Sequence, residues 1–280
     1  MNSAIFADVP IGEMIALAVG LGVSGLLAGT VAGLLGVGGG IVLVPVLYQT
    51  LGILGIDESV RMPLAVGTSL ATIIPTSIRS TLSHNAKGAV DWDVLKRWAV
   101  PTVVGVALGT WLASLVGGKG LTAVFAGGAA SLGLFMVFGR EDWRLGDKLP
   151  LGVGSWLLGL ANGCLSVMMG IGGGTFGVTV MTLFGTTIHR AVATAAGFGL
   201  IIGVPGTIGM IANGWTAQGL PPFSLGYVNL VGLLLIVPAT IVAAPWGVAI
   251  AHSLSRRTLR LAFGLFLCAT ALRMGFAFFR

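Results

Sequence analysis

Long apolar segments separated by short polar stretches run along the whole chain. A transmembrane helix needs roughly 20 predominantly apolar residues, and between Ala191 and Ser255 there is no Asp, Glu, Lys or Arg. The pattern predicts ten apolar segments, near residues 13–35, 40–54, 62–84, 93–116, 120–139, 150–169, 174–187, 191–212, 223–252 and 258–279. We therefore expect an all-α protein that crosses a membrane many times.

Two of these segments, 40–54 and 174–187, are short, and each begins at a glycine cluster. The sequence Gly-Val-Gly-Gly-Gly at 36–40 returns 134 positions later as Gly-Ile-Gly-Gly-Gly at 170–174. A continuous helix over 13–54 would be about 60 Å long, twice the thickness of a bilayer core. The short helices are therefore expected to start at breaks near the membrane midplane. Corresponding interrupted segments in two halves of a chain point to the binding site of a transporter.

Three further matches occur in the same order and indicate that the chain is duplicated. The motifs at 65–68, 75–78 and 100–102 are similar to those at 191–194, 205–208 and 237–240, with spacings of 126, 130 and 137. We expect a first transmembrane repeat at 1–139, a charged cytoplasmic linker at 140–149 and a second repeat at 150–280. Five segments per repeat is an odd number, so the second repeat would be inverted. Inverted repeats permit alternating access to a site near the midplane.

The distribution of basic residues favours ten crossings over eight. With ten crossings and the N-terminus outside, ten Lys and Arg residues fall inside and three outside, whereas eight crossings split them nearly evenly. Basic residues concentrate on the cytoplasmic side of membrane proteins. Both termini are therefore expected outside, in the periplasm. Arg79 and Arg273 remain within the membrane.

Composition excludes several classes of protein. The 280 residues include only 15 Lys and Arg and 9 Asp and Glu, far fewer than the roughly 25% charged residues of a soluble domain. A lipid bilayer is the expected surrounding, and no basic cluster is large enough to suggest a nucleic-acid partner. Every acidic residue lies in a loop or at a segment end, which disfavours cation transport. No metal-ligand spacing or nucleophile–base set lies at membrane depth. We therefore expect that the protein is not an enzyme and binds no metal or cofactor.

The glycine clusters favour a small anion as the substrate. A helix that starts at a break presents unpaired N–H groups and the positive end of its dipole. The expected ligands are the backbones of Gly38, Gly39, Gly40, Gly172, Gly173 and Gly174, with the hydroxyls of Thr68, Ser69 and Thr194 as secondary donors. Arg79 is a candidate attractor of the anion. The alternatives are glycines that serve close packing, hydroxyls bonded back to their own helix and an arginine that snorkels to the interface.

The residues also resemble a known family. The stretch 33–45 is similar to the first signature of the TauE/SafE sulfite exporter permeases, 65–69 to the second, and 170–174 to the repeated cluster. The resemblance implies transport of a sulfur-containing anion, such as sulfite, a sulfonate or sulfoacetate, across a bacterial inner membrane. Thr179 stands opposite Pro45 and Ala195 opposite Ser69, so the two halves of the site are unequal. A passive anion channel, a carrier of a non-sulfur organic anion, the coupling ion and a homodimer are left open.

Overall fold

A computed structural model describes residues 19, 22–23, 25–30, 39–139, 143–253 and 256–278. Most of the expected segment 13–35, and Gly38, lie outside these residues. The described helices are α2 (Gly40–Ile53), α3 (Glu58–Ala86), α4 (Trp92–Phe138), α5 (Val153–Met168), α6 (Gly174–Leu183), α7 (Ile188–Asn213), α8 (Leu230–Ser253) and α9 (Arg256–Phe278). A short antiparallel hairpin of β1 (Ser224–Leu225) and β2 (Val228–Asn229) precedes α8. The described part of the chain is therefore mostly helical, as expected.

The long helix α4 is two helices that meet at Gly117. Gly117 has a φ of 63° and a ψ of −166°, values that no α-helix contains. Gly109, before the kink, and Gly128, after it, both pack against residues near the end of α5, at Val167 and Met169 respectively. The chain therefore doubles back at Gly117. The two parts agree with the separate segments expected at 93–116 and 120–139.

Three expected boundaries differ from the structure by four residues or more, and one of them is the start of α3, at Glu58 rather than near residue 62. The segment expected at 223–252 begins as the hairpin, and its helix starts only at Leu230. The hairpin turns at Gly226, which has a φ of 53°, so an apolar run that looked continuous is divided by a turn. Helix α6 ends at Leu183, four residues before the expected end, and Gly185 follows it with a φ of 82°.

The outer surface of the structure is apolar, as a lipid-facing surface must be. In the described residues, three helices are long and apolar enough to cross a membrane: α4, α7 and residues 230–247 of α8. Large apolar side chains such as Leu234 and Phe276 are 73% and 72% exposed. A water-soluble protein rarely exposes apolar side chains over so much of its surface.

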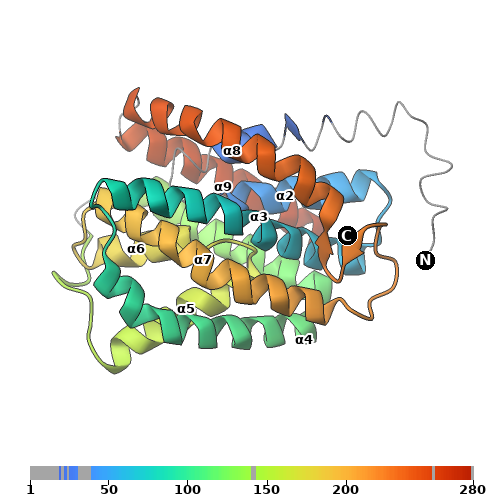
Figure 1. Cartoon of the computed structure of the whole chain (residues 1–280), viewed down its shortest axis with the longest axis horizontal. Helices are drawn as coiled ribbons and strands as arrows, with labels where there is room; N and C mark the ends of the chain where they lie inside the picture. The colour runs from blue at the N-terminus through green and yellow to red at the C-terminus, as the bar shows by residue number, and fades with distance from the viewer. Residues whose placement is uncertain are drawn as a thin grey trace.

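The helices run roughly along one direction, and the loops gather at the two ends (Figure 1). The linker around residues 143–152 lies at one end of this view, and the β1–β2 hairpin lies at the other. The backbone N–H of Leu145 donates to the carbonyl of Leu183 at 2.8 Å, so the linker and the end of α6 share one end. Arg190 at the start of α7 pairs with Asp91 at the start of α4, which brings these two helix starts together.

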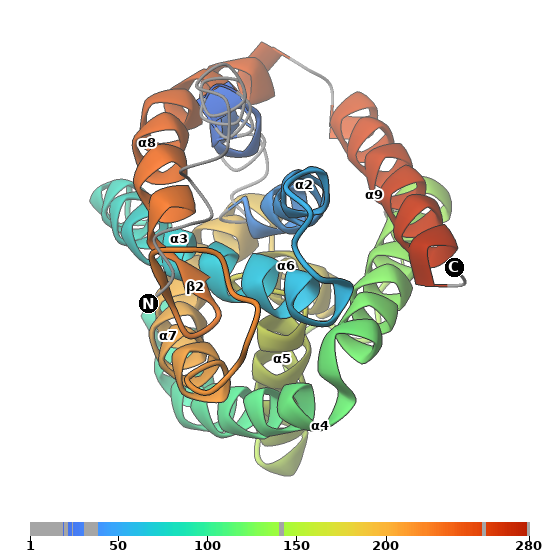
Figure 2. The same cartoon turned by 90° about the vertical axis from the view of Figure 1, so that its right-hand side faces the viewer.

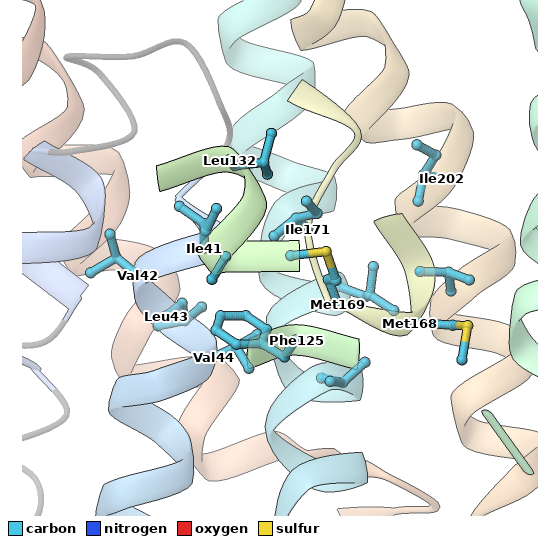
Figure 3. Packing of buried hydrophobic residues seen from close by; sticks show 14 of the residues in the cluster. Ile41, Val42, Leu43, Val44, Phe125, Leu132, Met168, Met169, Ile171 and Ile202 are labelled. Atoms are coloured by element: carbon cyan, nitrogen blue, oxygen red, sulfur yellow. The ribbon is translucent and has the colours of Figure 1, made fainter. Parts of the chain in front are cut away.

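Helices α2 and α6 lie in the middle of the helix array. A view along the helices shows α2 surrounded by α3, α4, α7, α8 and α9 (Figure 2). Helix α6 packs against α7 and α5. The start of α2 is packed into the main apolar core. Residues 41–44 gather with Phe125 of α4 and with Met169 and Ile171 of the turn after α5 (Figure 3). The two short helices are therefore enclosed by protein rather than by lipid.

Candidate functional site

Helices α2 and α6 each begin at a left-handed glycine. Gly39, the N-cap of α2, has a φ of 73°, and Gly173, the N-cap of α6, has a φ of 72°. This conformation suits glycine, which has no Cβ to clash with the backbone. Because both N-caps are glycines, no capping side chain bonds to the N–H groups of the first turn in either helix. Both helix starts are buried, so these N–H groups face the protein interior.

The two glycine clusters meet inside the protein. A Cβ added at Gly40 would lie only 2.5 Å from the carbonyl oxygen of Gly170, so the backbones of the two clusters are in direct contact. A Cβ at Gly172 would lie 2.8 Å from the Ile73 side chain and 3.1 Å from the Cα of Gly199. Ile73 and Gly199 lie near the middle of α3 and α7. The clusters therefore meet at about mid-depth, between these two long helices.

Ser69 ties α3 to the second cluster. Its hydroxyl donates to the carbonyl oxygen of Gly170 at 2.7 Å, and its side chain is fully buried. Gly170 itself has a φ of 66° and lies against the backbone of Val66. Ala195, at the corresponding position of the second half, has no hydroxyl to make such a bond. The hydroxyl of Ser69 therefore holds the turn in place and is not directed at open space.

Thr68 and Thr194, which correspond in the two halves, each bind the start of a helix from the other half. Thr194 accepts a hydrogen bond from the backbone N–H of Asp91, the N-cap of α4, at 2.9 Å. Thr68 accepts one from the backbone N–H of Asn229, just before α8, also at 2.9 Å. The side chains of Asp91 and Asn229 each accept a bond from the N–H three residues further on. Both threonine oxygens are thus bound to the backbone of another element, not to their own helix.

Two buried donors near the start of α6 have no protein partner. They are the amide nitrogen of Asn162, on α5, and the hydroxyl of Thr175, in the first turn of α6. Their residues are 0% and 1% exposed. A buried polar group without a hydrogen bond costs roughly 1–3 kcal/mol. Two buried donors without a protein partner, beside a helix start, form an arrangement that a bound anion would complete.

Asn162 lies directly against the cap of α6. A Cβ at Gly173 would lie 3.2 Å from Asn162 Nδ2 and 3.3 Å from its Oδ1. The hydroxyl of Ser166 lies 3.5 Å from the Oδ1 atom and donates to it. From the sequence alone, Asn162 is a plausible polar lining residue or an interhelical contact. Thr175 is not predicted, because its position becomes informative only when α5 and α6 are folded against each other. The signal in the sequence was the nearness of Asn162 to the second cluster.

Arg79 is not brought into this buried region. Its side chain is exposed on α3, beyond Ile73 toward the end of the helix, and Arg273 is likewise exposed on α9. The buried polar side chains of the described residues are all Ser, Thr or Asn. Any anion held where the clusters meet would therefore be bound by neutral donors and helix dipoles. Gly38 lies outside the described residues.

The fold and this site define a helical membrane protein with two short buried helices that begin at glycines, an architecture typical of transporters. The chain belongs to the TauE/SafE sulfite exporter family, whose model matches residues 21–274. A probable membrane transporter protein of Haemophilus influenzae is 32% identical over 89% of this chain and 95% of its own length. Another from Methanocaldococcus jannaschii is 24% identical over 85% and 87%, and one from Bacillus subtilis is 25% identical over 85% and 89%. No solved structure matches the chain.

Proposed function

We propose that this protein is a secondary transporter that moves a small sulfur-containing anion, such as sulfite, a sulfonate or sulfoacetate, across the bacterial inner membrane. The observation that carries this proposal is the buried contact between the start of α2, at Gly40, and Gly170 of the glycine turn that leads into α6, with no side chain capping either helix. Two such starts supply unpaired N–H groups and positive dipole ends at mid-depth. The choice of a sulfur-containing anion rests on membership of the family, since the neutral donors of the site suit any small oxyanion.

The proposed binding region comprises both glycine clusters, with the neighbouring hydroxyls in supporting positions. Thr68, Ser69 and Thr194 fix the elements around the clusters through their bonds to other backbone segments. Arg79, exposed on α3, would act only as a long-range attractor. The lipid bilayer is the surrounding partner, and a homodimer remains a prediction.

We infer alternating access between two inverted repeats, 1–139 and 150–280, joined by the linker at 140–149. The reciprocal bonds of Thr68 and Thr194 support this division, because each crosses from one repeat to a helix start in the other. Two equivalent contacts exchanged in this way are what a two-fold relation between repeats would produce. Rocking of one repeat against the other would then open the shared site to each side in turn.

Binding of an anion by the purified protein is the first test. A thermal-shift panel at fixed ionic strength would compare sulfite, sulfate, thiosulfate, taurine, sulfoacetate, acetate and chloride, with Na⁺ and K⁺ varied separately. A ligand at 100 times its Kd stabilises the native state by about 2.7 kcal/mol. We expect a selective rise in Tm with a sulfur oxyanion or sulfonate. A response to cations alone would contradict the proposal.

Transport in proteoliposomes separates the carrier from the two other candidates. A carrier gives saturable uptake of the labelled anion and counterflow when the unlabelled anion is trapped inside. An anion channel gives conductance that does not saturate at millimolar concentrations. Preference for acetate over every sulfur compound would identify a carrier of non-sulfur organic anions.

A further inference from the structure

The two unpartnered donors beside α6 have no equivalent in the first half of the chain. At the 134-residue spacing that relates the glycine clusters, Asn162 corresponds to Ala28 and Thr175 corresponds to Ile41. Ala28 and Ile41 are both buried, at 0% and 1% exposure. The first half thus forms the matching element with apolar side chains at these positions. Packing of a short helix at a glycine break therefore does not require the amide or the hydroxyl.

The surroundings of Asn162 leave its amide nitrogen as a donor without an acceptor. Ser166 donates to Oδ1 at 3.5 Å, and Nδ2 has no hydrogen-bond partner in the protein. The amide lies against Gly173, the cap of α6. Thr175 contributes a second unpaired donor from the first turn of the same helix. Burying two donors without acceptors is unfavourable, so a ligand that accepts hydrogen bonds would be stabilised there.

We propose that Asn162 and Thr175 are the specificity-determining donors for the transported anion, acting together with the unpaired N–H groups at the start of α6. The proposal rests on the proposed function, because it concerns the ligand of the same site. The second repeat supplies the side-chain recognition of the oxyanion, and the first repeat supplies only its helix start. The ligand class is an oxyanion with at least two oxygen acceptors, such as a sulfonate, sulfite or carboxylate.

The test uses side chains that the fold already accepts at the matching positions. Asn162→Ala places there the residue found at position 28, and Thr175→Val keeps the shape of threonine without its hydroxyl. Titration calorimetry of the detergent-purified full chain would use the anion that gives the largest stabilisation of the wild type in the panel. Loss of one hydrogen bond to a charged ligand weakens binding roughly 10- to 100-fold. We expect a loss of this size in each variant.

Two matched controls show whether any loss is specific. Thr122→Val removes a buried hydroxyl of α4 that bonds back to the carbonyl of Gly118, and Asn213→Leu removes an amide that bonds to the carbonyl of Thr110. Both should bind the anion with wild-type affinity. The fold of each variant is checked by gel filtration and thermal unfolding. Asn162→Asp, which keeps the shape but places a carboxylate beside the anion, should lose binding more completely than Asn162→Ala.

The outcomes separate this inference from the function it rests on. If the wild type binds none of the anions, both the proposed function and this inference are contradicted. A wild type that binds an oxyanion while Asn162→Ala and Thr175→Val bind it equally well leaves the function standing and overturns the inference. An equal loss in Thr122→Val would also overturn it, because the effect would then be a general result of changing a buried hydroxyl.

Discussion

Glycine is needed at position 173 for its backbone conformation and for the space around it. The φ of 72° lies in the left-handed region, which costs other residues roughly 1–2 kcal/mol. A Cβ here would meet the Ile202 side chain and lie 3.2 Å from Asn162 Nδ2. Gly177, one turn further along α6, has helical φ, and a Cβ there would only make ordinary contacts with Phe198 and Asn162. The two positions therefore form a natural pair for comparison.

We predict opposite effects of alanine at these two glycines. Gly173→Ala should lower the free energy of unfolding by about 1–2 kcal/mol because of its strained φ. Gly177→Ala should raise it by roughly 0.5–1 kcal/mol because alanine favours a helix interior. Thermal or denaturant unfolding in detergent measures both. Equal effects at the two positions would mean that the cap of α6 is not held in the left-handed conformation.

The positions of the important hydroxyls could be found from the sequence, but their partners could not. Thr68 and Thr194 stand out because they occupy matching places in the two halves. Their hydrogen-bond partners lie 161 and 103 residues away, and the partner of Ser69 lies 101 residues away. No local pattern encodes contacts at such separations. Thr175 could not be identified as a site residue from the sequence for the same reason.

Helices α4 and α8 are each held at their start by a threonine from a long central helix. The backbone N–H of Asp91 and that of Asn229 have no partner within their own helices, as for any helix start. Thr194 on α7 and Thr68 on α3 supply those partners. The contacts join elements from different halves of the chain. Their removal should therefore weaken the association of the halves.

We predict that Thr68→Val and Thr194→Val each destabilise the protein by roughly 1–3 kcal/mol, because each leaves a partly buried N–H without an acceptor. Thr122→Val is the matched control, since its hydroxyl bonds only to the carbonyl of Gly118, one turn back in its own helix. It should cost less than the other two. The comparison uses the midpoints of unfolding in one detergent. A control as destabilising as Thr68→Val would show that these bonds between the two halves of the chain contribute no more to stability than a bond within one helix.

The helix boundaries show where apolar patterning is sufficient and where it is not. Glycines mark the starts of α2 and α6 correctly, at Gly40 and Gly174. The pattern failed where an apolar run includes a turn, as in the hairpin around Gly226. There the side chains remain apolar while the backbone changes direction. A run of apolar residues indicates burial or contact with lipid. It does not by itself distinguish a helical from an extended backbone.

The two ends of the molecule can be distinguished by their loops. The linker, the end of α6 and the starts of α4 and α7 belong to one end. The kink of α4 belongs to the other, because a Cβ at Gly118 would lie 2.5 Å from the carbonyl of Ser59, at the start of α3. The second part of α4, from 118 to 138, is long enough at about 1.5 Å per residue to span the roughly 30 Å of a bilayer core between the two ends.

This arrangement predicts opposite accessibility for two exposed lysines, Lys119 beside the kink and Lys148 in the linker. Each would be replaced by cysteine in a chain whose own Cys164 and Cys268 are changed to alanine. If the positive-inside orientation holds, a membrane-impermeant thiol reagent should label Lys119→Cys in intact cells. It should label Lys148→Cys only after the membrane is opened. The reverse result would place the linker outside and invert the orientation. Labelling of both from the same side would contradict a membrane crossing between the kink and the linker, and with it the odd number of segments on which the inverted repeat depends.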